Sequence, residues 1–177
     1  FLLFTMIPIV CSMGLSFMEW DSANPMEFVG IENFKRLFSD ETFVISLKNT
    51  VYYSVFTVPL TMAAALGLAM LLNQKLKGIN IFRTIFFFPH VASLVAVAVV
   101  WNLLFHPTLG PVNNILRAIG IADPPGWTSS IQWAMPVIII VSIWKSMGYY
   151  MILYLSGLQA IPRELYEAAK VDGANRF

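Results

Sequence analysis

Long stretches without charged residues constrain this chain more than any other feature. No Asp, Glu, Lys or Arg occurs in 1–18, 49–74 or 84–116, and the stretch 131–158 contains a single charge, Lys145. A membrane-spanning helix needs about 20 mainly apolar residues. The pattern therefore predicts an all-α membrane protein with spans near 1–18, 47–72, 84–105 and 131–158.

The composition supports this prediction and excludes several kinds of function. Hydrophobic residues make up 58% of the chain and charged residues 12%, whereas soluble domains usually contain about 25% charged residues. A soluble helical bundle is therefore disfavoured, and the net charge of +1 gives no reason to expect a nucleic-acid partner. Cys11 is the only cysteine, and His90 and His106 have no partners at metal-ligand spacing, so we expect no metal site.

Catalysis by this chain is disfavoured as well. The charge-poor stretches contain no paired carboxylates and no nucleophile with a neighbouring base. We therefore expect no catalytic residues in them.

The distribution of basic residues predicts the orientation in the membrane. The short connector 73–83 has three basic residues and no acid, and the tail 161–177 has three more basic residues. The connectors 19–46 and 106–130, with their flanks, have four basic residues mixed with most of the acids. We expect 73–83 and 161–177 to face the cytoplasm, and the two longer connectors to face the outside.

Local patterns within this plan predict surface helices and close helix packing. Apolar residues at helical spacing predict short amphipathic helices near 33–38 and 111–119. Proline occurs once in each predicted span, where it permits a bend. The pairs Ala63/Gly67 and Ala65/Ala69 are spaced by four residues and would let another helix approach closely.

A stripe of polar residues in the fourth charge-poor stretch is the strongest candidate for a solute contact. Its members share one helix face at the spacing i, i+3, i+4, i+7. They are Ser142, Lys145, Ser146 and Tyr149, with Trp144 and Tyr150 beside them. Hydroxyl groups can bond sugar hydroxyls, and aromatic rings can cover the apolar faces of sugars.

Lys145 has two possible roles within this stripe. It lies about 14 residues from either end of its span, roughly 21 Å at about 1.5 Å per residue, which is too far to reach the surface. A lysine at this depth costs at least ~2.5–3.5 kcal/mol and must face protein or water. It either lies on a solute path or pairs with an acid or carbonyl of another helix. No acid occurs in the four stretches, so a structural partner is expected outside this chain.

The polar segment after the fourth span predicts a short helix followed by a turn. Glu164 and Glu167 favour the positive end of a helix dipole, and Leu165 with two alanines forms a small apolar face. Gly173 permits a backbone turn that a side chain would resist.

This segment, "ELYEAAKVDGANRF", resembles the EAA loop of ABC importer permeases, the membrane subunits of binding-protein-dependent uptake systems. Glu167, Ala168, Ala169 and Gly173 match its pattern. Segments along the whole chain resemble the carbohydrate-uptake branch in the same order. They are "FVGIENFKRLFSD" (28–40), "LKNTVYYS" (47–54), "FRTIFFFPHV" (82–91) and "VWNLLFHPTLGPVN" (100–113).

The resemblance implies a type I importer transmembrane domain with about six core helices. Four are visible, so 1–177 is expected to be part of this domain, ending in the coupling segment 161–177. The implied partners are two ATP-binding cassette subunits, a second permease subunit in a heterodimer, an extracytoplasmic solute-binding protein and membrane lipid. ATP and Mg²⁺ would bind to the partner subunits, because this chain has no phosphate-binding loop and no cofactor of its own.

The resemblance also implies roles for the singled-out residues. The four EAA-loop residues named above would couple the ATPase to the spans. The helix before that loop contributes to the solute site in sugar permeases, which agrees with a substrate pathway along the stripe. Its expected members are Ser142, Trp144, Lys145, Ser146 and Tyr149.

The expected function is ATP-driven import of a carbohydrate, polyol or sugar phosphate across the cytoplasmic membrane of a bacterium or archaeon. Two alternatives stay open: the same architecture importing an amino acid or peptide, and an ATP-independent carrier or channel.

Overall fold

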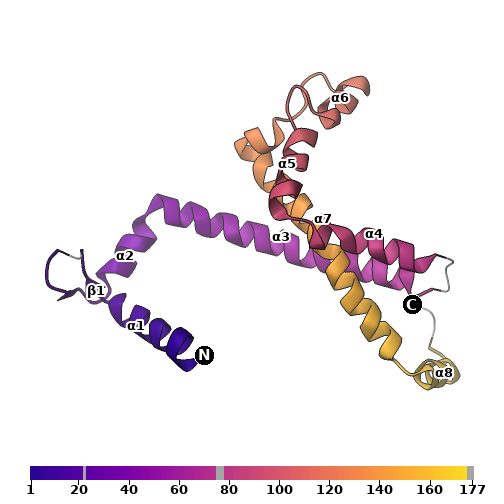
Figure 1. Cartoon of the computed structure of the whole chain (residues 1–177), viewed down its shortest axis with the longest axis horizontal. Helices are drawn as coiled ribbons and strands as arrows, with labels where there is room; N and C mark the ends of the chain where they lie inside the picture. The colour runs from indigo at the N-terminus through magenta and orange to yellow at the C-terminus, as the bar shows by residue number, and fades with distance from the viewer. Residues whose placement is uncertain (22, 75–77, 175–177) are drawn as a thin grey trace. The chain divides into compact units, whose positions relative to one another are not determined.

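A computed structural model of the chain describes residues 1–21, 23–74 and 78–174 (Figure 1). The chain divides into two compact units, Phe1–Val51 and Tyr52–Phe177. Lys75, Lys77 and Arg176, on which the predicted orientation partly depends, lie outside the described residues.

The first unit contains helices and a very short hairpin. A π-helical turn, Leu2–Met6, leads into α1, Ile7–Leu15. The two-residue strands β1, Met18–Glu19, and β2, Glu27–Phe28, pair antiparallel. The hairpin precedes α2, Glu32–Ser39, which confirms the amphipathic helix predicted near 33–38. The first predicted span is an apolar helix of fewer residues than a full crossing, Leu2–Leu15.

The helix α3 runs from Glu41 to Leu72 and is apolar and long enough to cross a membrane. It begins six residues before the predicted start at 47. Asp40 explains the early start, because its Oδ1 accepts the backbone N–H groups of Thr42 at 2.7 Å and Phe43 at 3.3 Å. This is the side-chain cap that a helix N-terminus requires.

The rest of the second unit consists of helices joined by short connections. Its elements are α4, Ile79–Val91; α5, Leu94–Leu104; α6, Pro111–Ala118; the 3₁₀ turn η2, Trp127–Ser129; α7, Ile131–Ala160; and α8, Arg163–Val171. The helix α7 is the second helix that is long and apolar enough to cross a membrane. The observed α6 confirms the short helix predicted near 111–119.

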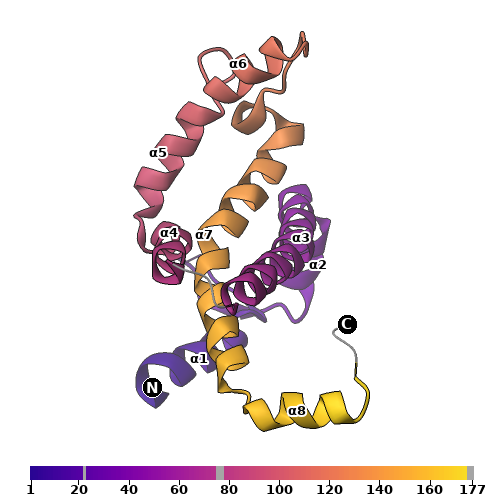
Figure 2. The ribbon, with the colours of Figure 1, turned by 90° about the vertical axis from the view of Figure 1, so that its right-hand side faces the viewer.

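The third predicted span, 84–105, is wrong as a single helix. The chain bends by 98° between α4 and α5, at Ala92 and Ser93. Figure 2 shows α4 almost end-on and α5 turning away from it. The hydrophobic pattern could not reveal this break, because both helices are apolar. Only the backbone hydrogen bonds show where α4 ends and α5 begins.

The helices α3 and α7 pack through a small apolar cluster. It contains Ala65, Ala69 and Leu72 of α3 and Met151 and Leu155 of α7, all buried. The predicted close approach through Ala65 and Ala69 is therefore confirmed. The other predicted pair is different: Ala63 is exposed, and nothing lies within 4 Å of a Cβ built on Gly67.

The helices α4 and α7 approach most closely at Gly148. A Cβ on this residue would overlap the carbonyl oxygen of Phe86 on α4. Glycine is therefore required here for the two backbones to meet.

We expect Gly148→Ala to lower the stability of the assembled protein in detergent, by about 1–3 kcal/mol, because the added methyl group forces the helices apart. Gly157→Ala on the same helix is the matched control, since nothing lies within 4 Å of its Cβ position. Thermal unfolding of the two variants compares them directly. Equal unfolding temperatures would contradict the close contact.

Candidate functional site

Lys145 of α7 reaches the end of α4 rather than open space. Its Nζ donates to the carbonyl oxygens of Pro89 at 3.1 Å, His90 at 3.1 Å and Ala92 at 2.8 Å. The ammonium group has three donors, and all three are directed to carbonyls of one short segment.

These carbonyls need a partner from outside their helix. The last backbone bond of α4 runs from the N–H of Ala92 to Phe88, and the ladder of α5 starts with the carbonyl of Ser93, bonded by Val97. The carbonyls between these points have no following helical turn to bond them. They also form the negative end of the α4 dipole, which favours a cation. Lys145 therefore supplies the hydrogen-bond donors for the carbonyls left without helical partners at the break between α4 and α5.

The partner of Lys145 was expected outside this chain, and that expectation is wrong. The polar partner is the backbone of α4, which no count of acidic residues can reveal. Of the two interpretations of Lys145, the geometry favours the structural pair.

Aromatic side chains of α7 also contact α4 and α5. The ring of Tyr149 stacks on His90 with centroids 4.7 Å apart and an angle of 16°. Trp144 meets Trp101 of α5 edge-on at 5.4 Å. Two of the predicted pathway residues therefore contact the α4–α5 segment, as Lys145 does.

Ser146 lies elsewhere, on a cavity between α7 and α3. The cavity has a volume of about 280 Å³. Its lining residues are Tyr53, Thr57, Val58, Thr61, Met62, Ser146 and Tyr150. The structure therefore divides the predicted stripe: Lys145 and Tyr149 face α4, whereas Ser146 faces α3. Ser142 is partly buried one helical turn before Ser146.

The threonines of this cavity were not singled out in the sequence. Thr57 and Thr61 continue the spacing of four residues that also contains Ala65 and Ala69. Residues four apart share one helix face, so this spacing places the two threonines on the same face as the two alanines. The sequence therefore carried a signal for their position.

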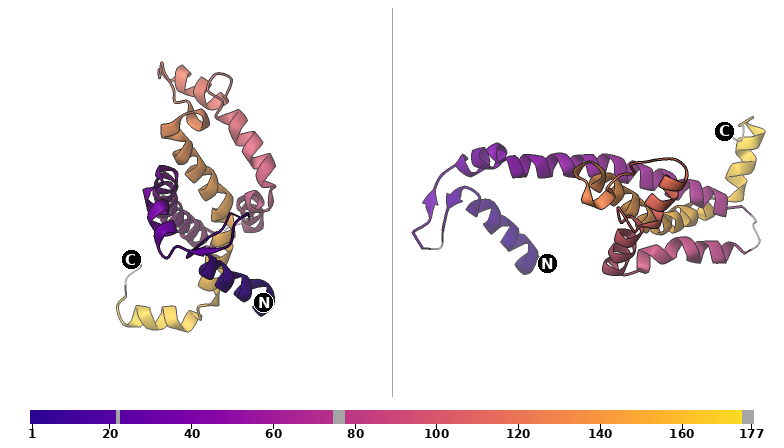
Figure 3. Two further views of the ribbon diagram at one scale, coloured as in Figure 1. Left: turned by 90° about the vertical axis from the view of Figure 1, so that its left-hand side faces the viewer. Right: turned by 90° about the horizontal axis from the view of Figure 1, so that it is seen from above.

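The predicted coupling residues lie on or just after α8. Figure 3 shows α8 leaving the end of α7 at a steep angle. Glu167, Ala168 and Ala169 are exposed on this helix. Gly173 has a φ of +82°, and the N–H of Ala174 bonds the carbonyl of Ala169 at 2.9 Å. This arrangement is a Schellman cap, so the predicted glycine turn is confirmed.

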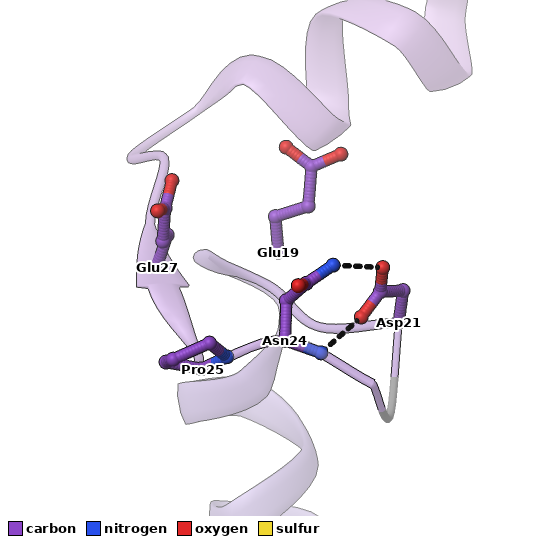
Figure 4. Close-up of a pocket in the computed structure, with 5 residues that line it drawn as sticks. All are labelled: Glu19, Asp21, Asn24, Pro25 and Glu27. Carbon is purple, nitrogen blue, oxygen red and sulfur yellow. Dashed lines mark hydrogen bonds between the residues drawn. The ribbon is translucent and has the colours of Figure 1, made fainter.

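A second, acidic pocket of about 340 Å³ lies in the loop between β1 and β2 (Figure 4). Asp21 accepts the backbone N–H groups of Asn24 at 2.8 Å and Ala23 at 3.0 Å, and these bonds hold its pKa below the ordinary value. Arg36 donates to Glu19 at 3.2 Å. The loop backbone thus supplies partners to Asp21, and α2 supplies one to Glu19. Within the described ranges no group of three His, Cys, Asp or Glu residues could hold a metal ion.

Comparison with known proteins gives consistent matches. Residues 57–177 match the family model described as "Binding-protein-dependent transport system inner membrane component". The chain is 39% identical to the probable ABC transporter permease protein YurN of Bacillus subtilis, over 100% of this chain and 62% of that protein. It is 43% identical to the lactose transport system permease protein LacF of Rhizobium radiobacter, over 96% of this chain and 57% of that protein.

A solved structure is similar over the same length. It is that of a bacterial alginate ABC transporter in complex with a periplasmic protein bound to an alginate pentasaccharide. The TM-score is 0.81 at 31% identity, covering 99% of this chain and 58% of the other. The chain thus spans about three-fifths of the length of the proteins that it matches.

We expect Lys145→Met to lower the free energy of unfolding of the assembled protein by roughly 2–4 kcal/mol, because carbonyl groups left without partners inside a membrane each cost about 1–3 kcal/mol. Lys145→Arg should recover part of this loss, since it keeps a cation with several donors. Lys48→Met is the control, because Lys48 is exposed on α3. Thermal unfolding in detergent measures the effect. Unchanged stability together with lost uptake would instead place Lys145 on the solute path.

Proposed function

Since the chain belongs to the family of binding-protein-dependent transport system inner membrane components, we propose that it is a permease subunit of an ATP-driven importer for a carbohydrate or related polyol. The observation that carries the proposal is the family match over 57–177, together with 43% identity to a lactose permease along nearly the whole chain. The similar solved structure is that of a transporter for alginate, an acidic polysaccharide.

The chemistry of α7 supports a carbohydrate as the solute. Ser142, Ser146 and Tyr149 offer hydroxyl groups, and Trp144 offers an aromatic ring, on a mainly apolar helix. Hydroxyls donate to and accept from sugar hydroxyls, and rings cover the apolar faces of sugars. We propose that the solute path follows this helix. Lys145 would shape the path by holding the α4–α5 break instead of binding an anionic solute.

The exposed helix α8 supports a coupling role. Its apolar side chains Leu165 and Val171 are 60% and 87% exposed. Small residues at Ala168 and Ala169 allow a partner surface to approach closely. We propose that α8 fits a cleft in an ATP-binding subunit, with Glu167 pairing with a basic group there and Gly173 setting the turn that follows.

The full assembly would contain two ATP-binding subunits, a second permease subunit in a heterodimer, and a solute-binding protein outside the membrane. ATP and Mg²⁺ would bind to the ATP-binding subunits. Residues 73–83 and 161–177 would face the cytoplasm, where α8 meets the ATPase. Residues 19–46 and 106–130 would face the solute-binding protein.

The proposed mechanism is alternating access. Closure of the ATP-binding subunits moves α8, and α8 is joined to α7 by only two residues, Ile161 and Pro162. Because α7 contacts both α3 and the α4–α5 segment, its displacement would reorient the surfaces on its two sides. Hydrolysis and release would return α8 to its first position.

We expect the complete transporter, reconstituted in proteoliposomes with its binding protein, to accumulate a neutral sugar in an ATP-dependent way. The panel contains lactose, trehalose, glycerol 3-phosphate, glutamine and a dipeptide. Complexes assembled without the ATP-binding subunits are the control. Accumulation of only glutamine or the dipeptide would contradict the carbohydrate class, and uptake without the ATP-binding subunits would indicate a carrier or channel.

We expect Gly173→Val to uncouple ATP hydrolysis from uptake, because a β-branched residue is strained at a φ of +82°. Gly173→Asn is the matched control, since Asn tolerates this conformation. Glu167→Lys should uncouple as well by reversing the charge on the docking face. The measurement is the ratio of solute transported to ATP hydrolysed. Wild-type ratios in both Gly173→Val and Glu167→Lys would contradict the coupling role of α8.

A further inference from the structure

The connector between α5 and α7 is held together by one buried side chain. Asn113 of α6 is 1% exposed, and its Nδ2 donates to the carbonyls of Pro107 at 2.8 Å and Pro125 at 3.1 Å. Its Oδ1 accepts a hydrogen bond from the Nε1–H of Trp127. Both amide hydrogens and the amide oxygen are therefore used, as a buried amide requires. These bonds tie α6 to the segments before and after it.

The start of α6 also lies directly against the end of α5. A Cβ on Gly110, the residue before α6, would overlap the carbonyl oxygens of Leu104 and His106. Only glycine permits this close approach of the two segments. The position of α6 is therefore fixed at the level where α5 ends (Figure 2).

Aromatic side chains mark that level as a boundary of the membrane. The ring centroid of Phe105 lies 5.3 Å from that of Trp101 and 4.9 Å from that of Trp127, which in turn lies 5.5 Å from Trp133. Three of the five tryptophans in the chain thus share one cluster, and tryptophan is enriched where membrane helices meet the headgroups. Since α7 crosses the membrane between this cluster and α8, the boundary is the one opposite α8.

The helix α6 has an apolar face that the described part of the chain leaves exposed. Ile115 is 63% exposed, and Ile119, four residues later, is 69% exposed. Leu109, just before the helix, is exposed as well. Arg117 is the only charged residue of α6 and lies two residues from each isoleucine, on the opposite side of the helix. Its Nη2 donates to the carbonyl of Pro107 at 3.0 Å, so the exposed face carries no charge.

An exposed apolar surface of α5 leads up to this helix. Val95, Val99 and Leu103 are spaced by four residues and are all exposed, so they form one stripe along α5. The acyl chains of lipid are as apolar as these side chains, so the stripe suits contact with lipid. It ends at the turn from which α6 starts. The apolar face of α6 therefore continues a surface that already faces the membrane.

We propose that α6 is an interfacial helix that inserts Leu109, Ile115 and Ile119 into the lipid leaflet opposite α8. Lipid is the occupant that the observations select, because the face is uncharged, lies at the headgroup level and follows the apolar stripe of α5. Asn114 and Arg117 would remain among headgroups and water. The helix would anchor the ends of α5 and α7 in the plane of the membrane. The inference is independent of which solute is imported.

The test measures the depth of single spin labels on α6 in the complete transporter, reconstituted in vesicles of phosphatidylethanolamine and phosphatidylglycerol. Cys11 and any other cysteine of the complex are first replaced with serine. A nitroxide at Ile115→Cys or Ile119→Cys should collide with oxygen in preference to a water-soluble nickel chelate, at a depth of roughly 5–10 Å into the boundary between headgroups and acyl chains. Asn114→Cys is the matched control, because Asn114 is exposed on the polar side of the same helix. Its label should collide mainly with the nickel chelate.

Three results would overturn the inference. Equal collision with the nickel chelate at Asn114→Cys and Ile115→Cys would place both sides of α6 in water. Low accessibility of the Ile115→Cys label to both reagents would show that another protein segment, such as the second permease subunit, covers this face. Accessibility to the nickel chelate that disappears when the solute-binding protein is added would make that protein the partner. None of these results bears on the proposed import function, which the ATP-dependent uptake assay measures separately.

Discussion

The bond between the Lys145 ammonium and the carbonyls at the end of α4 is the interaction on which the second unit depends. Within a membrane, a helix can break only where protein groups satisfy the freed backbone. Here the break lies at Ala92 and Ser93, and one side chain from α7 bonds the carbonyls of Pro89, His90 and Ala92. The same contact satisfies the cation, so two groups that are costly to bury stabilise each other.

This junction gives the two sides of α7 different roles. On one side, Gly148 lets the backbone of α4 approach, and Tyr149 stacks on His90. On the other side, Met151 and Leu155 pack against Ala65 and Ala69 of α3, and a cavity of about 280 Å³ lies between the same two helices. A close contact on one face and an incompletely filled one on the other suit the proposed role of α7 in transmitting movement from α8.

The hydrophobic pattern predicted the helical membrane class, both long spans and the helix with a glycine turn at 163–173, because each depends on local sequence. It could not predict the break after α4, since no charged residue interrupts 84–116 and apolar residues lie on both sides of the break. It also could not assign Lys145, because the partner is backbone and carries no residue type that a sequence displays. The four-residue spacing could have placed Thr57 and Thr61 on the face of Ala65 and Ala69, but only the structure shows that their hydroxyls are buried without partners among the described residues.

The most direct test of this account is a structure of the complete transporter in lipid with a neutral sugar bound. We expect the Lys145 Nζ within hydrogen-bond distance of the carbonyls of Pro89, His90 and Ala92, with a sharp bend between α4 and α5. A continuous α4–α5 helix, with Lys145 turned toward the solute or an acidic residue, would contradict it.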